Sequence, residues 1–163
     1  MSRPGQAGRV DEARVGDLLV FYGSLLRGLG LEGEPEREPG LSFVGPCRVA
    51  GELYLVGPQA RYPGLRLTSP PPGARRHRRA GRGAADGAGV LGEAWRVESL
   101  ETLAAFDAWE LGGYSPDDAA VPYRRVRVRL LEPDVDAWVY EGLHPDPGPV
   151  VVGGDWRAHV GVR

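Results

Sequence analysis

Short apolar runs separated by segments rich in glycine and proline set the pattern of this chain. Residues 18–22 (LLVFY) are apolar throughout and precede Gly23, a pattern typical of a buried strand that enters a turn. Residues 43–57 contain an internal proline and an internal glycine, so we expect this stretch to be bent or broken rather than one straight strand. Residues 62–65 (YPGL) predict a turn followed by a short apolar stretch.

The second half of the chain shows clearer periodicity. Residues 90–97 have a strand-like composition around a tryptophan. In residues 123–131 (YRRVRVRLL) the apolar side chains fall on one face, whereas Arg125, Arg127 and Arg129 fall on the other. This alternation predicts a half-buried strand whose arginines face water. Residues 137–140 predict a further short strand.

One segment, residues 98–110, is a good helix candidate. Ser99 can cap its N-terminus, and Gly112 and Gly113 can end it. Six or seven short strands and one helix predict an α+β fold. We expect a small, mostly antiparallel or mixed sheet, closed into a β-barrel and flanked by few helices.

The chain has 163 residues, enough for one domain with a real core. Residues 1–16 are polar and rich in glycine and arginine, and we interpret them as a flexible leader before a single domain over residues 17–163. Within that domain, residues 69–89 have neither apolar periodicity nor bulk to bury, so they predict a disordered insertion.

Composition narrows the possible chemistry and partners. All 20 basic residues are arginine, so a Schiff-base lysine and the lysine of a P-loop are impossible. The formal net charge of −2 gives no reason to expect nucleic acid as a partner, and no apolar run approaches the roughly 20 residues that span a bilayer. The lone Cys47 cannot form an internal disulfide, which fits a cytoplasmic protein.

The helix candidate carries two carboxyl groups on its apolar face. Leu100, Leu103, Asp107 and Glu110 share this face, which we expect to point into the core. Glu110 also lies at the C-terminal end, where the helix dipole disfavours negative charge. Burial and dipole therefore both raise the pKa of this carboxyl group above its ordinary value of about 4.3, as proton transfer near neutral pH requires. The alternative is that Glu110 lies on a frayed helix end in water, with Asp107 at the surface.

The segment FYGSLLRG (residues 21–28) forms the second element. A strand that opens into Gly23 and Ser24 exposes successive backbone N–H groups, which can bind a carboxylate or a developing oxyanion. Such turns are usually structural, so this segment alone does not assign a function. Ser24 as a nucleophile would need a nearby base, and the histidines, His77, His144 and His159, lie in the insertion or in loop and tail positions.

Together the two segments resemble the γ-glutamylcyclotransferase-like (AIG2-like) family. FYGSLLRG resembles the family's YGSL- or YGTL-type loop, and LAAFDAWE (residues 103–110) resembles its later LD-x-x-E segment. The resemblance implies that Glu110 is the catalytic acid–base residue and that no metal or organic cofactor is needed. It further implies that substrate is bound by the following residues: Tyr22, Gly23, Ser24, Leu25 and Tyr123.

The resemblance also implies a reaction on a small-molecule γ-glutamyl substrate. The α-amine of the γ-glutamyl group attacks its own γ-carbonyl, which closes 5-oxoproline and releases an amine or amino acid. One landmark is ambiguous: the family's GELY segment matches either residues 51–54 (GELY) or residues 92–95 (GEAW). The alternative function is a non-catalytic module of the same fold that binds a small ligand, and the sequence indicates no oligomeric state.

Other clusters predict ordinary structural roles. No pair of histidines and no Cys/His pair has recognised metal-ligand spacing, so we predict no metal site. The arginine-rich run at residues 75–82 lacks aromatic residues for base stacking, which favours a solvated loop over a polyanion-binding arm. We expect Cys47 and the four tryptophans to pack in or around the core, although Trp109 could line a pocket beside Glu110.

Overall fold

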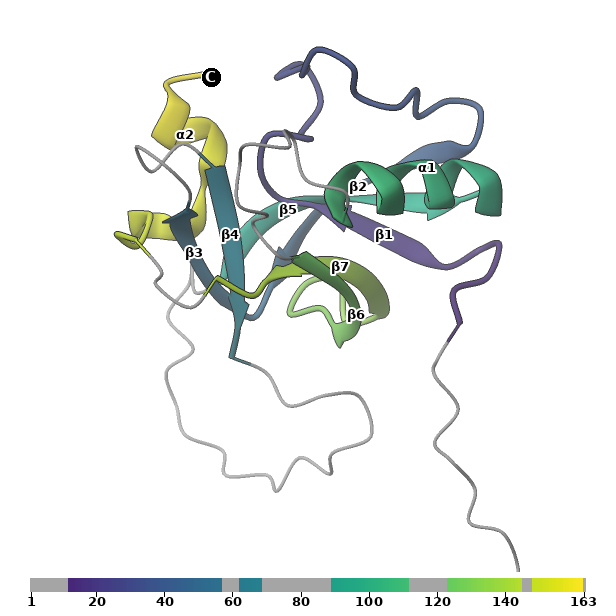
Figure 1. Cartoon of the computed structure of the whole chain (residues 1–163). Coiled ribbons are helices and arrows are strands. Elements are labelled where there is room, and N and C mark those ends of the chain that lie inside the picture. The colour runs from purple at the N-terminus through teal and green to yellow at the C-terminus, as the bar shows by residue number, and fades with distance from the viewer. Residues whose placement is uncertain (1–11, 57–61, 69–88, 112–122, 145–147, 163) are drawn as a thin grey trace, which may run out of the picture.

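A computed structural model describes residues 12–56, 62–68, 89–111, 123–144 and 148–162 (Figure 1). Most of the predicted leader and all but the last residue of the predicted insertion lie outside the described residues. The end of the leader is attached to the domain, because the Gly16 N–H donates a hydrogen bond of 2.8 Å to the Val97 carbonyl. Within the described residues, no helix combines the length and apolar character needed to cross a membrane.

Five strands form one sheet, in the order β2-β5-β1-β7-β6. The pair β1–β7 is parallel, and the other three neighbouring pairs are antiparallel. The strands are β1 (Leu18–Phe21), β2 (Leu41–Val49), β5 (Val90–Val97), β6 (Tyr123–Arg129) and β7 (Asp136–Gly142). The predicted α+β class and the mixed, mostly antiparallel pairing are confirmed.

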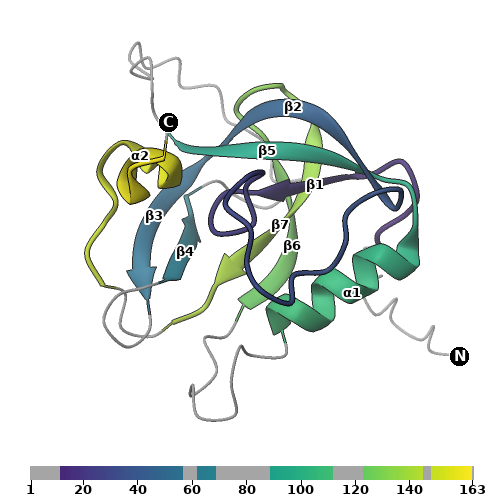
Figure 2. The ribbon, with the colours of Figure 1, turned by 90° about the horizontal axis from the view of Figure 1, so that it is seen from above.

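The expectation of a closed barrel was wrong, because the five-stranded sheet is open. Its edge strands, β2 and β6, are not paired with each other within the described part of the chain. An isolated bridge instead joins Arg48 of β2 to Glu132, which lies after the end of β6. After β2 the chain instead leaves this sheet. β3 (Gly51–Val56) pairs with β4 (Tyr62–Leu67) in a separate two-stranded sheet, which Figure 2 shows beside the larger one.

Residues 43–57 are broken, as predicted. β2 ends at Val49 and β3 begins at Gly51. The predicted turn at residues 62–65 was wrong, because these residues begin β4. Pro63 fits there because β4 has a strand partner on one side only and therefore needs fewer ladder N–H groups. Gly64 fits because a Cβ at this position would lie 2.7 Å from Tyr54 Cζ, so only glycine leaves room for that ring.

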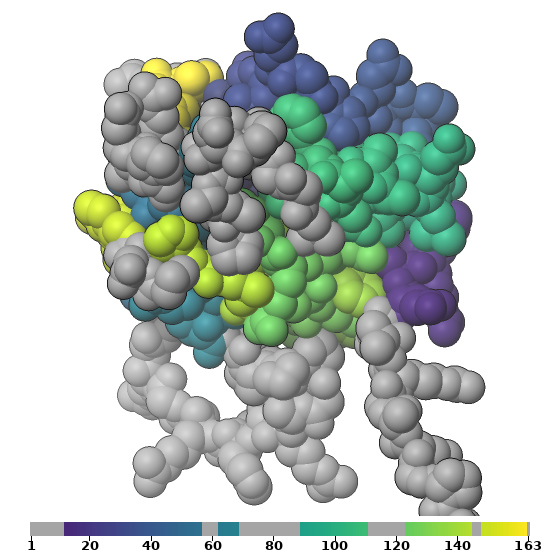
Figure 3. All heavy atoms as spheres, in the orientation of Figure 1, coloured from purple at the N-terminus to yellow at the C-terminus, as the bar shows by residue number. Residues whose placement is uncertain are grey.

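The predicted helix is present as α1 (Leu100–Leu111), and Figure 3 shows its surface between the segment that precedes β2 and strands β6 and β7. Ser99 caps it, since its Oγ accepts a hydrogen bond of 3.4 Å from Thr102 N. The buried face consists of Leu103, Phe106 and Glu110, whereas Leu100 is half exposed. The apolar face is therefore rotated away from Leu100, which the sequence had placed on it.

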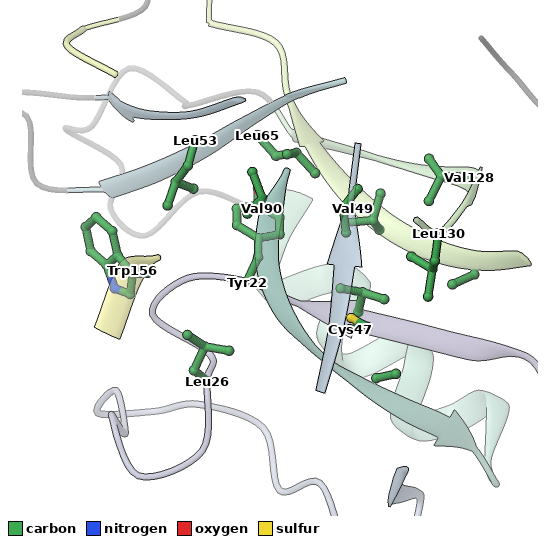
Figure 4. Packing of buried hydrophobic residues seen from close by; sticks show 14 of the residues in the cluster. Tyr22, Leu26, Cys47, Val49, Leu53, Leu65, Val90, Val128, Leu130 and Trp156 are labelled. Carbon is green, nitrogen blue, oxygen red and sulfur yellow. The ribbon is translucent and has the colours of Figure 1, made fainter. Parts of the chain in front are cut away.

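Strand β1 is buried on both sides, which explains its unbroken apolar sequence. Val20 and Tyr22 pack into a cluster with Cys47 and other buried residues (Figure 4). Leu19 and Phe21 pack on the opposite side with the apolar residues of α1. The chain therefore has a core on each side of β1.

The C-terminal segment forms a short helix that the sequence did not predict. A 3₁₀ turn, η2 (Val152–Gly154), leads into α2 (Trp156–Val160). Asp155 caps α2, because its Oδ1 accepts a hydrogen bond of 3.1 Å from Ala158 N. Trp156 is buried, so this helix is attached to the core of the domain.

Candidate functional site

A pocket lies where β1 ends and the chain turns away from the sheet. It contains about 380 Å³ of empty space, counting its open mouth. All six predicted site residues line it, although they come from three separate segments: the loop after β1, the end of α1 and the start of β6. The described lining consists of Val20, Phe21, Tyr22, Gly23, Ser24, Leu25, Tyr62, Pro63, Glu110, Tyr123 and Tyr140.

Glu110 is the only acidic side chain among the described lining residues. It is 8% exposed, because it lies on the face of α1 that carries Leu103 and Phe106 into the core. The alternative of a frayed helix end in water therefore does not hold. The last turn of α1 places this carboxyl group in the pocket, where a ligand can meet a proton donor or acceptor that is largely shielded from solvent.

The loop after β1 brings backbone groups to the same pocket. A turn is closed by a hydrogen bond of 2.9 Å from Leu26 N to Gly23 O. Leu25 and Leu26 are both buried and anchor the loop in the two apolar clusters. Among the backbone hydrogen bonds between described residues, none has the Ser24 or Leu25 N–H as its donor. These two N–H groups are therefore candidates to bind a carboxylate or an oxyanion.

Tyrosine hydroxyls fix the walls of the pocket. Tyr22 Oη donates a hydrogen bond of 2.7 Å to the Tyr140 carbonyl, and Tyr123 Oη donates one of 2.8 Å to the Pro63 carbonyl. Burial raises the pKa of Tyr22 well above its ordinary value, and the nearby Tyr123 and Glu110 raise it further. This hydroxyl therefore stays protonated at neutral pH and acts as a donor.

Asp107 connects α1 to the strands behind the pocket. Its Oδ1 accepts a hydrogen bond of 2.8 Å from Tyr140 Oη and lies 3.0 Å from Arg125 Nε. Burial, followed by the charge and the hydrogen bond of Asp107, raises the pKa of Tyr140 above its ordinary value. The prediction that Arg125 faces water was wrong, because the folded sheet packs its face against α1 and gives Arg125 an acidic partner there.

The remaining candidate groups lie elsewhere. No histidine is among the described residues that line the pocket, and His77 is outside the described part of the chain, so Ser24 has no histidine base in the described lining. Cys47 is buried in the core, as predicted. Trp109 is absent from the described lining. Its ring packs beside Gly33, where an added Cβ would lie 3.3 Å from the ring. The described residues contain no cluster of three His, Cys, Asp or Glu side chains able to hold a metal.

Comparison with known proteins gives the family. The sequence profile of the family described as "Gamma-glutamyl cyclotransferase, AIG2-like" matches residues 19–158, which include every described residue that lines the pocket. The chain belongs to this family. No curated protein sequence matches it significantly.

Two crystal structures share the fold of this AIG2-like chain. An uncharacterised protein from Pyrococcus horikoshii is 19% identical, with a TM-score of 0.57, and the alignment covers 88% of this chain and 92% of that one. A protein specific to uropathogenic E. coli is also 19% identical, with a TM-score of 0.58 and coverage of 91% and 98%. At this identity the likeness concerns the fold alone.

Sequence reasoning did not assign five of the described lining residues of this AIG2-like domain to the site: Val20, Phe21, Tyr62, Pro63 and Tyr140. Val20 and Phe21 were predicted only as part of a buried strand. Tyr62 and Pro63 belong to the YPGL segment, which gave a signal but was interpreted as a turn. Tyr140 gave no signal, because an apolar residue of a short strand is normally assigned to the core. Its position in the pocket follows from the pairing of β7 with β1, a long-range contact that no local pattern encodes.

Proposed function

We propose that this chain is a γ-glutamyl cyclotransferase, in which Glu110 is the acid–base residue. The observation that carries the proposal is the burial of one carboxyl group in the same pocket as the backbone of residues 22–25. Membership of the AIG2-like family supports this assignment. The substrate is a small molecule with a free α-amine and a γ-glutamyl bond.

The reaction is an intramolecular acyl transfer. The α-amine nitrogen attacks the γ-carbonyl carbon and forms the new C–N bond of a five-membered lactam. The bond between that carbon and the departing nitrogen then breaks, giving 5-oxoproline and a free amine or amino acid. Because nucleophile and electrophile belong to one molecule, the enzyme mainly has to fold the substrate and move protons.

Different pocket residues move the protons and position the substrate. Glu110 accepts the proton that the α-amine loses and returns one to the departing nitrogen. The N–H groups of Ser24 and Leu25 bind the substrate's carboxylate or stabilise the oxyanion that forms on the carbonyl oxygen. Tyr22 and Tyr123 hold the walls in place through the hydrogen bonds that their hydroxyls donate to main-chain carbonyls.

The same features favour an enzyme over a module that only binds. A binding module does not require a proton donor or acceptor, whereas the carboxyl group of Glu110 is 8% exposed and lies in the pocket, largely shielded from water. Acid–base catalysis, in contrast, requires such a carboxyl group beside the bound substrate.

Purified protein should be tested against γ-glutamyl amines and γ-glutamyl dipeptides, with 5-oxoproline as the measured product. The matched control is the same substrate with an acetylated α-amine, which cannot cyclise. We expect lactam from at least one free-amine substrate and none from its acetylated form. Absence of lactam across the panel, or release of glutamate rather than 5-oxoproline, would reject the proposal.

A further inference from the structure

The loop that lines the pocket is held at its far end by an ion pair outside the pocket, in which the carboxylate is buried and the arginine is partly exposed. Glu93 of β5 is 8% exposed, and its Oε2 accepts a hydrogen bond of 3.0 Å from the backbone N–H of Arg27. Arg27 follows the pocket-lining Leu25 by two residues. A carboxylate from the sheet therefore fixes the main chain immediately after the substrate-binding turn.

Arg157 of α2 completes this arrangement. Its Nη2 donates a hydrogen bond of 2.8 Å to Glu93 Oε1 and another of 2.6 Å to the carbonyl of Arg27. Both main-chain groups of Arg27 are thus bound, its N–H by an acid from β5 and its carbonyl by a base from α2. Charge-assisted hydrogen bonds of this kind are stronger than those between neutral groups.

Glu93 also fixes the near end of the loop. In the antiparallel pairing of β1 with β5, Glu93 lies opposite Phe21, the last residue of β1. Glu93 is therefore paired in the sheet with the strand that enters the loop, while its side chain binds the residue that follows the turn. Glu93 thus contacts the chain on both sides of the turn that carries the Ser24 and Leu25 N–H groups.

We propose that Glu93 and Arg157 are positioning residues for the substrate-binding loop, an inference that rests on the proposed cyclotransferase function. They do not line the pocket in its described part. They act through the main chain of Arg27, and they place the loop's N–H donors relative to Glu110. Because oxyanion donors work only within a narrow range of distance, loosening this contact lowers turnover even when the fold is intact.

Residues 92–95 and residues 51–54 provide a matched pair for the test, since both read Gly-Glu followed by apolar residues. In contrast to Glu93, Glu52 is exposed and lies 3.8 Å from Arg66 on the two-stranded sheet. Glu52→Gln therefore removes a carboxylate in the same sequence context without touching the loop. Arg157→Lys is the conservative variant, because one ammonium group can donate to both oxygens that Arg157 Nη2 contacts.

The experiment combines backbone amide hydrogen exchange of Leu26 and Arg27, the two loop residues whose N–H groups are hydrogen-bonded, with kcat/KM for lactam formation. Arg157→Met and Glu93→Gln should each speed exchange in this loop by about tenfold, as expected for loss of a charge-assisted hydrogen bond. Each should also lower kcat/KM by about tenfold or more, the cost expected for misplaced catalytic groups. Arg157→Lys should recover most of kcat/KM, and Glu52→Gln should leave both quantities unchanged.

Unchanged loop exchange in both Glu93→Gln and Arg157→Met would overturn the inference. Faster exchange with unchanged kcat/KM would also overturn it, because the loop would then be anchored without any effect on catalysis. If the wild-type protein forms no lactam, the proposed function fails by itself. The anchoring is then judged on exchange alone, with faster exchange supporting it and equal exchange rejecting it.

Discussion

Gly23 shows how a single residue type shapes the pocket. A Cβ added at this position would overlap Cγ of Pro63 and lie 3.0 Å from its Cβ. The proline ring is stiff and belongs to β4, so it cannot move without moving the strand. Glycine therefore lets the loop and β4 approach each other closely, and both line the pocket.

We predict that Gly23→Ala separates the loop from β4 and lowers kcat/KM for lactam formation by about tenfold or more. Adding Pro63→Ala removes the Cγ that the new methyl group would meet, so the double variant should recover part of the loss relative to Gly23→Ala alone. Steady-state kinetics of the two variants and of Pro63→Ala check this. Wild-type kinetics in Gly23→Ala would show that the close approach has no role.

At this scale the sequence was informative about the site. The helix pattern placed Glu110 on the buried face but left a solvated helix end open, and the family resemblance then selected it as a site residue. The loop residues could be predicted because their segment resembles a family motif. Tyr140 could not, because its place in the pocket depends on the pairing of β7 with β1.

At the scale of elements, the contact of α1 with β6 and β7 depends on Asp107. Asp107 accepts a hydrogen bond from Tyr140 Oη of β7 and forms an ion pair with Arg125 Nε of β6. The side chains of Asp107 and Arg125 are both about three-quarters buried. Removing one member of a partly buried charged pair leaves the other without compensation. The position of α1, and with it that of Glu110, is therefore sensitive to this residue.

Asp107→Asn is expected to lower the free energy of unfolding by about 1–3 kcal/mol, the range for hydrogen bonds to charged groups. Asp136→Asn is the control, since Asp136 pairs with Arg127 and Arg129 at a more exposed site and should change stability by about 1 kcal/mol or less. Urea unfolding followed by tryptophan fluorescence measures both. Equal losses in the two variants would refute the special role of Asp107.

The sequence predicted two elements wrongly, β4 and α2, but predicted the break between β2 and β3 correctly. The turn predicted at residues 62–65 is strand β4, because tertiary pairing with β3 outweighs the local preference of Pro63 and Gly64. Helix α2 was missed because it is a single short segment after a glycine pair, and its cap and buried Trp156 have meaning only in the folded chain. The break between β2 and β3 was predictable because Gly51 interrupts the apolar run.

For the molecule as a whole, the open sheet leaves two cores, one on each side of β1. The barrel expectation failed because closure depends on whether the edge strands β2 and β6 meet, which the number and length of strands do not determine. Ionisable groups inside these cores make stability depend on pH. Burial, with a smaller contribution from the charge of Glu93, raises the pKa of Cys47 from 9.0 to about 12.

This shift predicts a loss of stability in alkaline solution. The thiol ionises in the unfolded chain from about pH 9 but stays protonated in the folded chain up to about pH 12. The stability it contributes is therefore complete below pH 9 and is lost as the pH rises through this window. Between pH 8 and 10 the loss from this group is about 1.4 kcal/mol.

Urea unfolding of the wild type and of Cys47→Ala at pH 8 and pH 10 isolates this contribution. The variant should be less stable at pH 8 because of the cavity, but it should lose about 1.4 kcal/mol less than the wild type on going to pH 10. Tyr22 and Tyr140, whose pKa values are also raised, add a loss that both proteins share. An identical loss in the two proteins would refute the assignment to Cys47.

The most direct measurement is the rate of 5-oxoproline formation by Glu110→Gln, compared with Glu101→Gln on the exposed side of the same helix. The two variants remove the same charge, and circular dichroism should show both to be folded. Glu110→Gln should lose about a hundredfold or more of the wild-type rate, as expected for a general acid–base residue, whereas Glu101→Gln should keep it. A folded Glu110→Gln variant that forms lactam at the wild-type rate would contradict the central claim.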